Sequence, residues 1–347
     1  MALQGSGQIS YGDIQQEFGP TGSGGIGAYR VTESIGNLSN LGLDNNQNNP
    51  PTSEMPQGNS PISFQDFYGK RLNVVVDHHS GGTQYRQISR DRYNSNNVRV
   101  IGGFKSRPSN TSGSQIIIHV NKTFGSEKAN ANHCALRTGS WESSTQLQVD
   151  VGSSGRIRGA GGNGGNGSRE DGGEGGTGTS GLGIQYSPTK LNIRSGGLIS
   201  AGWGGGGGGG GGHDHDKGSE RHAGGGGGGG GAGFPSGNGG SGASGNEGAN
   251  GGNGTAGNND TAGNPGGGSN NDGEAYGGAG GEGGSNGEAA DDGNIGQGGE
   301  GSRSNGGEGG ESGAAIRRTN TGISISINGP VNIRGAYNPA PTGVSEN

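Results

Sequence analysis

Short apolar runs separated by Gly, Asn and Ser residues occupy the chain between positions 72 and 158. Their residues are β-branched or alternate between apolar and polar, which is typical of β-strands joined by turns. The predicted strands lie within 72–78, 97–104, 114–124 and 145–152. Ile116, Ile117 and Ile118 are apolar on both faces of the third run, which favours a central strand over an edge strand. The pattern predicts a small antiparallel β-sandwich.

A short motif occurs twice before this region, as ISYGDIQQEFG from position 9 and as ISFQDFYGK from position 62. In each copy a serine stands three residues before an aspartate, the spacing of a capping box that satisfies free N–H groups at a helix start. The pairs are Ser10 with Asp13 and Ser63 with Asp66, and Gly19 and Gly69 follow as C-terminal stops. The motif predicts two short capped helices, a unit too small for an enzyme and suited to docking on a partner.

Glycine dominates positions 159 to 313, and in several blocks it follows a period of three. These blocks are GGNGGNG at 161–167, GGEGGTG at 172–178, GGAGGEGG at 277–284 and GGEGG at 306–310. Three residues per turn is the geometry of the polyproline II helix, which has no internal hydrogen bonds. The backbone groups of such a rod therefore need partners on neighbouring rods. The tract predicts a bundle of glycine helices, whereas its broken phase and few prolines exclude collagen.

The composition of each triplet predicts where a rod lies in the bundle. Two glycines per triplet leave the third residue to face outwards, while the runs at 204–212 and 224–231 are pure glycine. We expect these two runs to be adjacent antiparallel rods in the interior, where even a methyl group would clash. Trp203 is expected to plug the base of the bundle, with sugar stacking as the alternative. The polar segments expected as tip loops are SRED, HDHDKGSERH, FPSGN, NNDTAGNP, SNNDGEAY and EAADDGNIGQ.

Composition limits the class of protein further. Of the 347 residues, 92 are Gly and only 23% are hydrophobic, too few for one large apolar core. The formal charge is −6 and the Lys and Arg residues are scattered, so we expect no nucleic-acid partner. Cys134 is the one cysteine, which excludes a disulfide within the chain and predicts a small core filler. The chain has no apolar stretch near 18 residues and no secretion signal, so we expect no membrane insertion and synthesis in a cytoplasm.

Together these patterns predict a mostly β and irregular fold. It would have a small N-terminal helical docking region, a β-sandwich-like middle domain and a polyglycine II helix bundle with tip loops. The expected regions are 1–71 for docking, 72–158 for the β-rich domain, 159–335 for the glycine-rich sandwich with its loops, and 336–347 for a C-terminal tail.

The glycine triplets broken by polar segments resemble the polyglycine-sandwich adhesins that cap the long tail fibres of T-even-type bacteriophages. The stretch GLISAGWGGGGGGGGG at 197–212 is similar to glycine-rich tail proteins of other phages, and the motif at 9–19 is similar to the start of virion structural proteins of tailed phages. The resemblance implies a layered stack of glycine helices whose distal loops bind a receptor on the host surface. The middle β region and the N-terminal repeat depart from the family.

The segment between the two pure glycine runs carries the candidate receptor-binding residues. They are His213, Asp214, His215, Asp216, Lys217, Glu220, Arg221 and His222, with Asp291 and Asp292 as further candidates. Their mixed charges suit polar groups on a receptor. His213 and His215 point the same way in an extended strand, so with His222 they could complete a zinc- or iron-type site; the alternative is a solvated loop tip. We expect no other cofactor.

The leading prediction is a virion protein, a tail fibre or tail tip adhesin made in the host cytoplasm that binds a host protein or polysaccharide. It would contact other tail proteins through its N-terminal region, and a homotrimer is a possible assembly. The alternative is a structural tail, baseplate or decoration protein without receptor contact. An ice-binding protein would show a flat face of small residues instead of charged loops. We expect no enzyme, because the acidic pairs at 170–171 and 291–292 lie in glycine-flanked loops without a packed wall.

Overall fold

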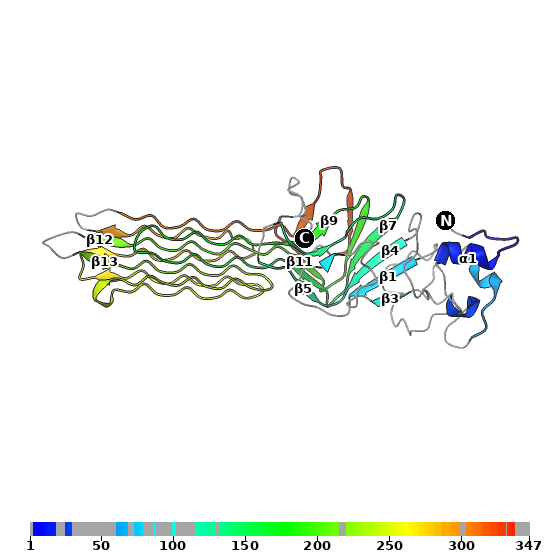
Figure 1. Cartoon of the computed structure of the whole chain (residues 1–347), viewed down its shortest axis with the longest axis horizontal. Coiled ribbons are helices and arrows are strands. Elements are labelled where there is room, and N and C mark those ends of the chain that lie inside the picture. Colours follow the sequence, from blue (N-terminus) through cyan, green and yellow to red (C-terminus); the bar gives the residue numbers. More distant parts are fainter. Residues whose placement is uncertain are drawn as a thin grey trace.

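The protein is elongated, and its parts follow one another along the long axis (Figure 1). The computed structural model describes residues 3–18, 25–29, 60–68, 73–78, 86–87, 99–101, 115–128, 132–214, 220–286, 288–298, 303–330 and 332–336. Helix α1 (Tyr11–Phe18) lies at one end and β-sheets form the middle. Long glycine segments extend to the other end, where β12 (Gly212–Asp214) and β13 (Arg221–Ala223) lie. The expectation of a mostly β and irregular fold is confirmed.

The N-terminal region contains the two predicted capping boxes. Ser10 donates its backbone N–H to Asp13 Oδ2 at 2.8 Å, and the Asp13 N–H donates to Ser10 Oγ at 3.1 Å. The hydrogen bonds from Ser10 lower the pKa of Asp13. In the second copy, the Ser63 N–H donates to Asp66 Oδ2 at 2.6 Å, and the helix is the 3-10 helix η4 (Phe64–Phe67). The stops expected at Gly19 and Gly69 lie outside the described residues.

The middle of the described chain is built from three β-sheets of mainly parallel strands. Their orders are β18-β10-β7-β4-β1-β3, β19-β11-β8-β5 and β17-β9-β6-β2. The strands are β1 (Asn73–His78), β2 (Arg86–Gln87), β3 (Arg99–Ile101), β4 (Gln115–Val120), β5 (Thr123–Gly125), β6 (Cys134–Arg137), β7 (Gln146–Val151), β8 (Arg156–Arg158), β9 (Ser180–Ile184), β10 (Thr189–Ile193), β11 (Leu198–Ser200), β17 (Ile316–Arg318), β18 (Ile325–Asn328) and β19 (Ile333–Arg334). Of these described pairs, only β1 with β3 is antiparallel.

From β4 onward, consecutive strands of these sheets belong to different sheets, so the chain passes through all three before it returns to the first. After β4, β5 and β6, strand β7 pairs in parallel with β4. The predicted antiparallel sandwich is therefore wrong, although strands lie within each of the predicted runs. The Gly, Asn and Ser turns direct the chain into the next sheet instead of reversing it in a hairpin. The prediction failed because the periodicity of a strand is the same in both arrangements. The prediction of a central strand at 116–118 is confirmed, because β4 lies between β1 and β7.

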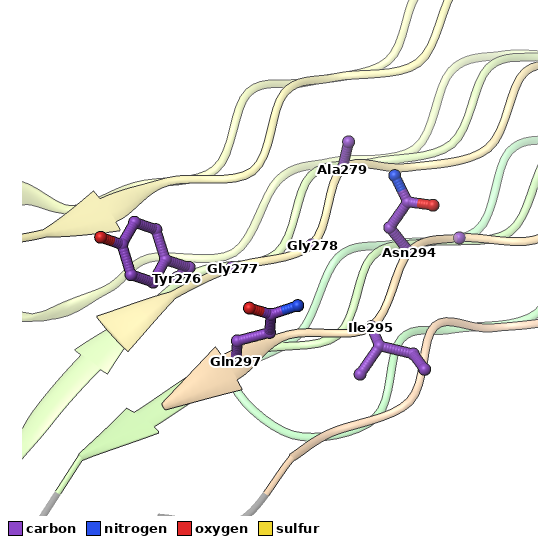
Figure 2. A pocket seen from close by; sticks show the side chains of 8 residues that line it. Tyr276, Gly277, Gly278, Ala279, Asn294, Ile295 and Gln297 are labelled. Atoms are coloured by element: carbon purple, nitrogen blue, oxygen red, sulfur yellow. The ribbon is translucent and has the colours of Figure 1, made fainter. Parts of the chain in front are cut away.

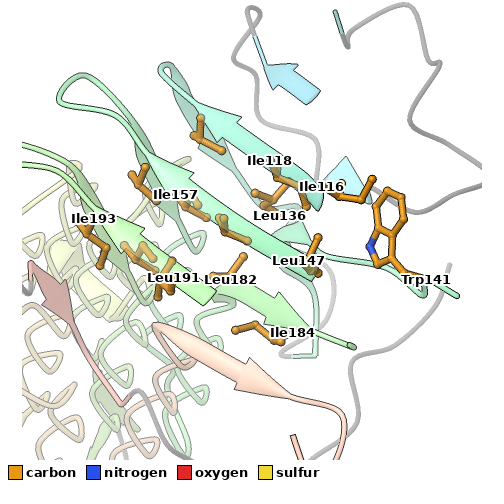
Figure 3. Packing of buried hydrophobic residues seen from close by; sticks show 14 of the residues in the cluster. Ile116, Ile118, Leu136, Trp141, Leu147, Ile157, Leu182, Ile184, Leu191 and Ile193 are labelled. Atoms are coloured by element: carbon orange, nitrogen blue, oxygen red, sulfur yellow. The ribbon is translucent and has the colours of Figure 1, made fainter. Parts of the chain in front are cut away.

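Parallel pairing places like residues opposite one another in the core (Figure 3). The aligned residues are Ile118, Val149 and Leu191 in the largest sheet, Phe124, Ile157 and Ile199 in the second, and Leu136, Leu182 and Ile316 in the third. All of them are fully buried, and Ile14 and Phe67 of the N-terminal helices belong to the same cluster. Each such side chain contributes roughly 1.5–3 kcal/mol on burial.

The glycine tract forms two long insertions between strands of these sheets, here called excursions. The chain leaves the sheets after β8 and returns at β9, and it leaves again after β11 and returns at β17. Strands from both sides of the expected boundary at 158 therefore complete the same sheets. Each excursion is held at both of its ends by a parallel strand.

Within the excursions the chain runs back and forth as extended segments, here called glycine rods. In the described chain the rods cover 160–168, 171–179, 202–211, 224–232, 237–243, 249–257, 263–269, 277–284, 290–296 and 304–313. Hydrogen bonds between neighbouring rods recur at every third residue: Gly162 N donates to Trp203 O and Gly165 N to Gly206 O, both at 2.8 Å. This is the period predicted from the triplets, and it gives each rod lateral partners for groups that it cannot pair internally.

The two pure glycine runs lie side by side in the interior, as predicted. Gly206 N donates to Gly229 O and Gly209 N to Gly226 O, both at 2.8 Å, so the runs are antiparallel. Each N–H from 205 to 211 donates to a carbonyl of another part of the chain. In the described chain, the rod 202–211 is bonded to rods 160–168, 171–179, 224–232, 277–284, 290–296 and 304–313. Because neighbours surround this rod, no position from 204 to 211 has room for a side chain.

Rods at the surface carry a polar residue at the third position of the triplet. Asn163 and Asn166 are exposed on rod 160–168. Their Oδ1 atoms accept hydrogen bonds from the backbone N–H groups of Asn238 at 3.0 Å and Ser241 at 2.9 Å. The third residue therefore faces outwards as predicted. It also accepts a hydrogen bond from an N–H of the adjacent rod, a role that the triplet pattern does not predict.

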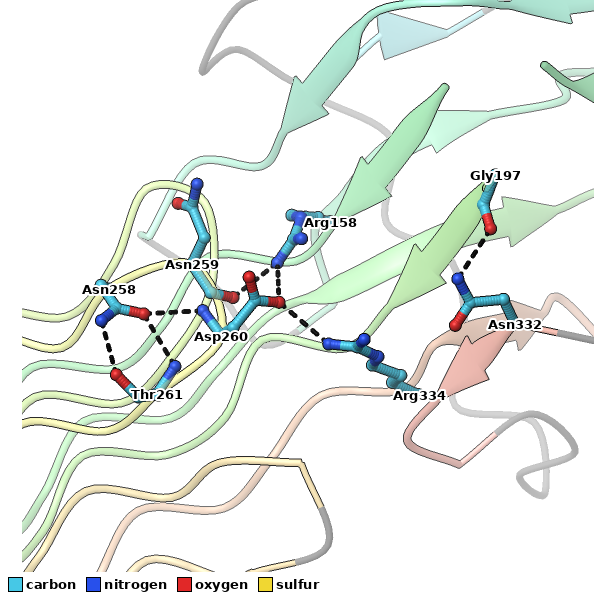
Figure 4. Close-up of polar contacts among 8 residues, drawn as sticks. All are labelled: Arg158, Gly197, Asn258, Asn259, Asp260, Thr261, Asn332 and Arg334. Carbon is cyan, nitrogen blue, oxygen red and sulfur yellow. Dashed lines mark hydrogen bonds and ion pairs between the residues drawn. The ribbon is translucent and has the colours of Figure 1, made fainter. Parts of the chain in front are cut away.

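Two segments expected at the tip lie at the base of the bundle instead. In FPSGN, the Phe234 N–H donates to the Gly159 carbonyl at 2.8 Å. In NNDTAGNP, Asp260 Oδ1 accepts from Nη1 of Arg158 and Nη1 of Arg334, both at 2.9 Å (Figure 4). Burial raises the pKa of Asp260, but the hydrogen bonds and charges of the two arginines outweigh it and lower the pKa. Rods alternate in direction, so only every second loop reaches the distal end.

Cys134 and Trp203 are buried as predicted. Cys134 is fully buried, and burial raises the pKa of its thiol to about 12. Trp203 is 5% exposed and packs with Ala201 and Ala232 near the start of the rod 202–211. Sugar stacking on Trp203 is therefore wrong, because its ring is not accessible.

We expect Gly208→Ala and Gly227→Ala each to destabilise the bundle. An added Cβ would fall inside van der Waals contact with the carbonyl oxygens of Asn166 and Gly240, respectively. Overpacking of this kind costs about 1–3 kcal/mol or more. Thermal unfolding followed by circular dichroism measures the loss.

Gly267→Ala is the matched control for these variants. Gly267 lies on rod 263–269, yet a Cβ added there meets nothing within 4 Å. We expect its free energy of unfolding to stay within about 0.5 kcal/mol of the wild type. Equal destabilisation by all three substitutions would show that close approach of the backbones is not what excludes side chains.

We expect Asp260→Asn to weaken the attachment of the base loop by less than about 1 kcal/mol, because the Asp260 side chain is 52% exposed. The folded-state pKa lies below the ordinary value of 3.8, so the charged cluster stabilises the protein fully above that value. The stabilisation is lost as the pH falls through the lowered pKa. Urea unfolding midpoints between about pH 6 and about pH 2 should fall more for the wild type than for the variant. The same pH dependence in both proteins contradicts this role of Asp260.

Candidate functional site

The distal end of the bundle is formed by loops that join outgoing rods to returning rods. These distal loops are 168–171, 212–223, 244–249, 270–276 and 297–303, and the structure describes them except for 215–219 and 299–302. They contain β12 with β13, the 3-10 helix η6 (Asn246–Gly248), and the sheet β14-β15-β16 of β14 (Asn270–Asn271), β15 (Ala275–Tyr276) and β16 (Gln297–Gly298). Segments far apart in sequence therefore meet at one end of the molecule (Figure 1).

Strands β12 and β13 form an antiparallel pair with His213 directly opposite His222. The two Nε2 atoms lie 3.1 Å apart, and the ring planes are inclined by 59°. Glu220 Oε2 lies 3.7 Å from His222 Nε2, while Asp214 is buried. The pure glycine rods that precede and follow these strands hold both histidines in place.

Polar side chains connect the distal loops to one another. Arg221 Nη1 lies 2.7 Å from Glu274 Oε2 and 3.8 Å from Asp272 Oδ2 on the loop 270–276. Asn246 Nδ2 donates to the Glu220 carbonyl at 3.0 Å. These contacts join three of the described loops into one surface of mixed charge.

A shallow groove lies on the flank of the bundle just below these loops (Figure 2). Its exposed side chains are Tyr276, Asn294, Ile295 and Gln297, and glycines form most of the rest of its lining. Tyr276 is 43% exposed, and its hydroxyl donates to the Gly273 carbonyl at 3.1 Å. Ile295 is 53% exposed. These four residues are not part of the predicted site, although the sequence offered a signal: an aromatic and a large aliphatic residue within polar, glycine-rich segments.

The structure brings together only part of the predicted site. His213, Asp214, Glu220, Arg221 and His222 share the distal surface, whereas His215, Asp216 and Lys217 lie outside the described residues. Asp291 and Asp292 do not join them, because they lie on rod 290–296 beside the middle of a pure glycine run. The Asp291 carbonyl accepts from Gly207 N at 2.9 Å, and Asp292 Oδ1 accepts from Gly309 N at 2.7 Å.

The predicted metal site stays a prediction. In the described part of the chain, no group of three His, Cys, Asp or Glu residues has an arrangement that could hold a metal ion. The pair of His213 and His222 would need a further ligand. Among the described helices, none is long and apolar enough to cross a membrane.

A family model of the phage tail fibre adhesin Gp38 matches residues 86–338. The chain belongs to this family. The match extends from β2 to the residues after β19 and includes all the glycine rods, but not α1 or β1. Searches among curated proteins and among solved structures gave no match.

Membership confirms the predicted resemblance to tail fibre adhesins of phages. The adhesin is thus a virion-associated protein of the phage tail, and its family points to a structural, binding role. The family also implies that it attaches to the tail and binds the host.

Proposed function

We propose that the adhesin recognises its host receptor through the distal loops. The observation that carries this proposal is the joining of separate loops by Arg221, Glu274 and Asn246 into one polar surface. This surface lies at the end of the molecule farthest from α1 (Figure 1). A virion protein that is anchored near its N-terminal end presents such a surface to the cell first.

The rods make this surface suitable for recognition. Hydrogen bonds between the rods hold the ends of every distal loop, so little conformational freedom is lost when the loops bind. Loops on a rigid scaffold are also where sequence changes are tolerated best. The mixed charges suit a protein or a polysaccharide on the host surface.

We propose further that the N-terminal region contacts other tail proteins. Phe64 is 42% exposed on η4, while Phe67 of the same helix is buried in the core. An exposed aromatic ring on a short capped helix is suited to an apolar pocket of a partner.

We expect Glu220→Ser/Arg221→Ser to reduce adsorption to host cells without loss of fold. The side chains are partly or largely exposed, so their ion pairs contribute about 0–1 kcal/mol to stability. Residues at the centre of a binding surface contribute about 2 kcal/mol or more, which corresponds to a loss of roughly 30-fold in affinity. Purified adhesin competing with phage for host cells gives the measurement, and circular dichroism checks the fold.

Glu308→Ser is the control for this variant, because Glu308 is exposed near the middle of rod 304–313 and belongs to none of the distal loops. Adsorption should be unchanged by it. If the loop variant also competes like the wild type, the distal loops do not recognise the host, and the structural tail role without receptor contact is the better explanation.

We expect Phe64→Ser to lower incorporation of the adhesin into virions by several-fold, because a polar residue removes the apolar contact. Ile295→Ser makes the same kind of change at the opposite end and should leave incorporation unchanged. Immunoblots of purified virions measure both. Equal incorporation of the Phe64 variant and the wild type contradicts docking through this helix.

A further inference from the structure

The groove on the flank of the bundle differs from the rest of the distal end in its chemistry. Its exposed side chains are uncharged, whereas the loops above it carry the ion pairs of Arg221. Tyr276 and Gln297 are direct cross-strand partners on β15 and β16. Figure 2 shows the Tyr276 ring beside the Gln297 amide, with Asn294 and Ala279 farther along the same groove.

The polar groups of the groove have unused hydrogen-bonding capacity. Neither the Asn294 nor the Gln297 side-chain amide has a hydrogen-bond partner among the described residues, and both are exposed. Each amide offers two donor hydrogens and an acceptor oxygen. On rod 160–168, by contrast, the Asn163 and Asn166 amides each accept a backbone N–H group of the adjacent rod.

The backbone of the groove is also open to a ligand. Rod 277–284 carries Ala279 at the outward position of its triplet, where rod 160–168 carries Asn163 and Asn166. The Ala279 N–H donates to no acceptor among the described residues, while the Asn294 N–H donates to the Ala279 carbonyl at 2.8 Å. The small side chains of this lining let a ligand approach the backbone closely.

The aromatic ring is held in a fixed orientation. The hydrogen bond from the Tyr276 hydroxyl to the Gly273 carbonyl restrains the ring, so its exposed surface is presented without further loss of side-chain freedom. A ring of this kind offers an apolar face of large area, and Ile295 adds a second apolar surface.

We propose that this groove binds a neutral saccharide unit of the host surface. The Tyr276 ring contacts the apolar face of a sugar ring, and the Asn294 and Gln297 amides bind its hydroxyl groups. The Ala279 N–H supplies a further donor. A sugar needs this combination of one apolar face and several uncharged donors and acceptors, whereas an acidic sugar would need a cation that the groove lacks. The inference rests on the proposed host-binding function and names the chemical class of ligand at one part of that surface.

The test is direct binding of sugars to the purified full-length adhesin. Saturation-transfer NMR and calorimetry would use neutral glucosides, galactosides and mannosides and their oligomers, with glucuronate and sialic acid as acidic comparators. We expect saturable binding of a neutral sugar. Tyr276→Ala should weaken it at least tenfold, and Asn294→Ala/Gln297→Ala should weaken it similarly.

Tyr276→Phe keeps the ring and removes only the hydroxyl that restrains it, so we expect its affinity to lie between those of the wild type and Tyr276→Ala. Thermal unfolding checks that each variant is folded. The absence of binding to all neutral sugars in the panel overturns the proposal. Preference for the acidic sugars, or equal binding by the wild type and Tyr276→Ala, overturns it as well.

The sugar assay and the adsorption assay separate this inference from the proposed function. If Glu220→Ser/Arg221→Ser lowers adsorption and no neutral sugar binds, the distal loops recognise the host and the groove does not. If a neutral sugar binds through Tyr276 and adsorption is unaffected by the loop variant, the groove is a saccharide site and recognition by the loops is wrong.

Discussion

The structure depends on how closely glycine backbones approach one another. In the interior rods each N–H from 205 to 211 donates to a carbonyl elsewhere in the chain, and a Cβ at Gly208 would overlap a carbonyl group. One such hydrogen bond contributes only about 0.5–1.5 kcal/mol to stability. Many of them join the rods on all sides, so the bundle is a lattice held by backbone groups. This is how a chain with only 23% hydrophobic residues forms a long ordered domain.

A lattice of glycine needs fixed ends, because glycine loses more conformational freedom on ordering than any other residue. The parallel sheets provide those ends and concentrate the apolar residues, such as Ile118, Val149 and Leu191, in one core. Since each excursion begins and ends at a strand of these sheets, the rods are anchored where they start and where they finish. Asp260 adds a polar connection between a base loop and two strands.

The backbone lattice separates stability from recognition. Rod packing uses few side chains besides outward residues such as Asn163 and Asn166, so residues of the distal loops are available for other roles. Tyr276 and Arg221 lie at the end of the lattice and contribute little to its hydrogen bonds. An adhesin built in this way can change its binding surface while the glycine framework is kept.

The features that follow from local sterics and residue spacing could be predicted from the sequence. These are the three-residue period, the interior place of the runs at 204–212 and 224–231, the outward third position, the strands and the two capping boxes. The parallel pairing of the strands and the position of the base loops could not be predicted, because both depend on how often the chain has already crossed the molecule. For the same reason, only the tertiary structure kept Asp291 from the distal surface and brought Tyr276, Asn294 and Gln297 into one groove. The distance of a residue from the distal end depends on its position along a rod and on the direction in which that rod runs. The sequence does not show this direction.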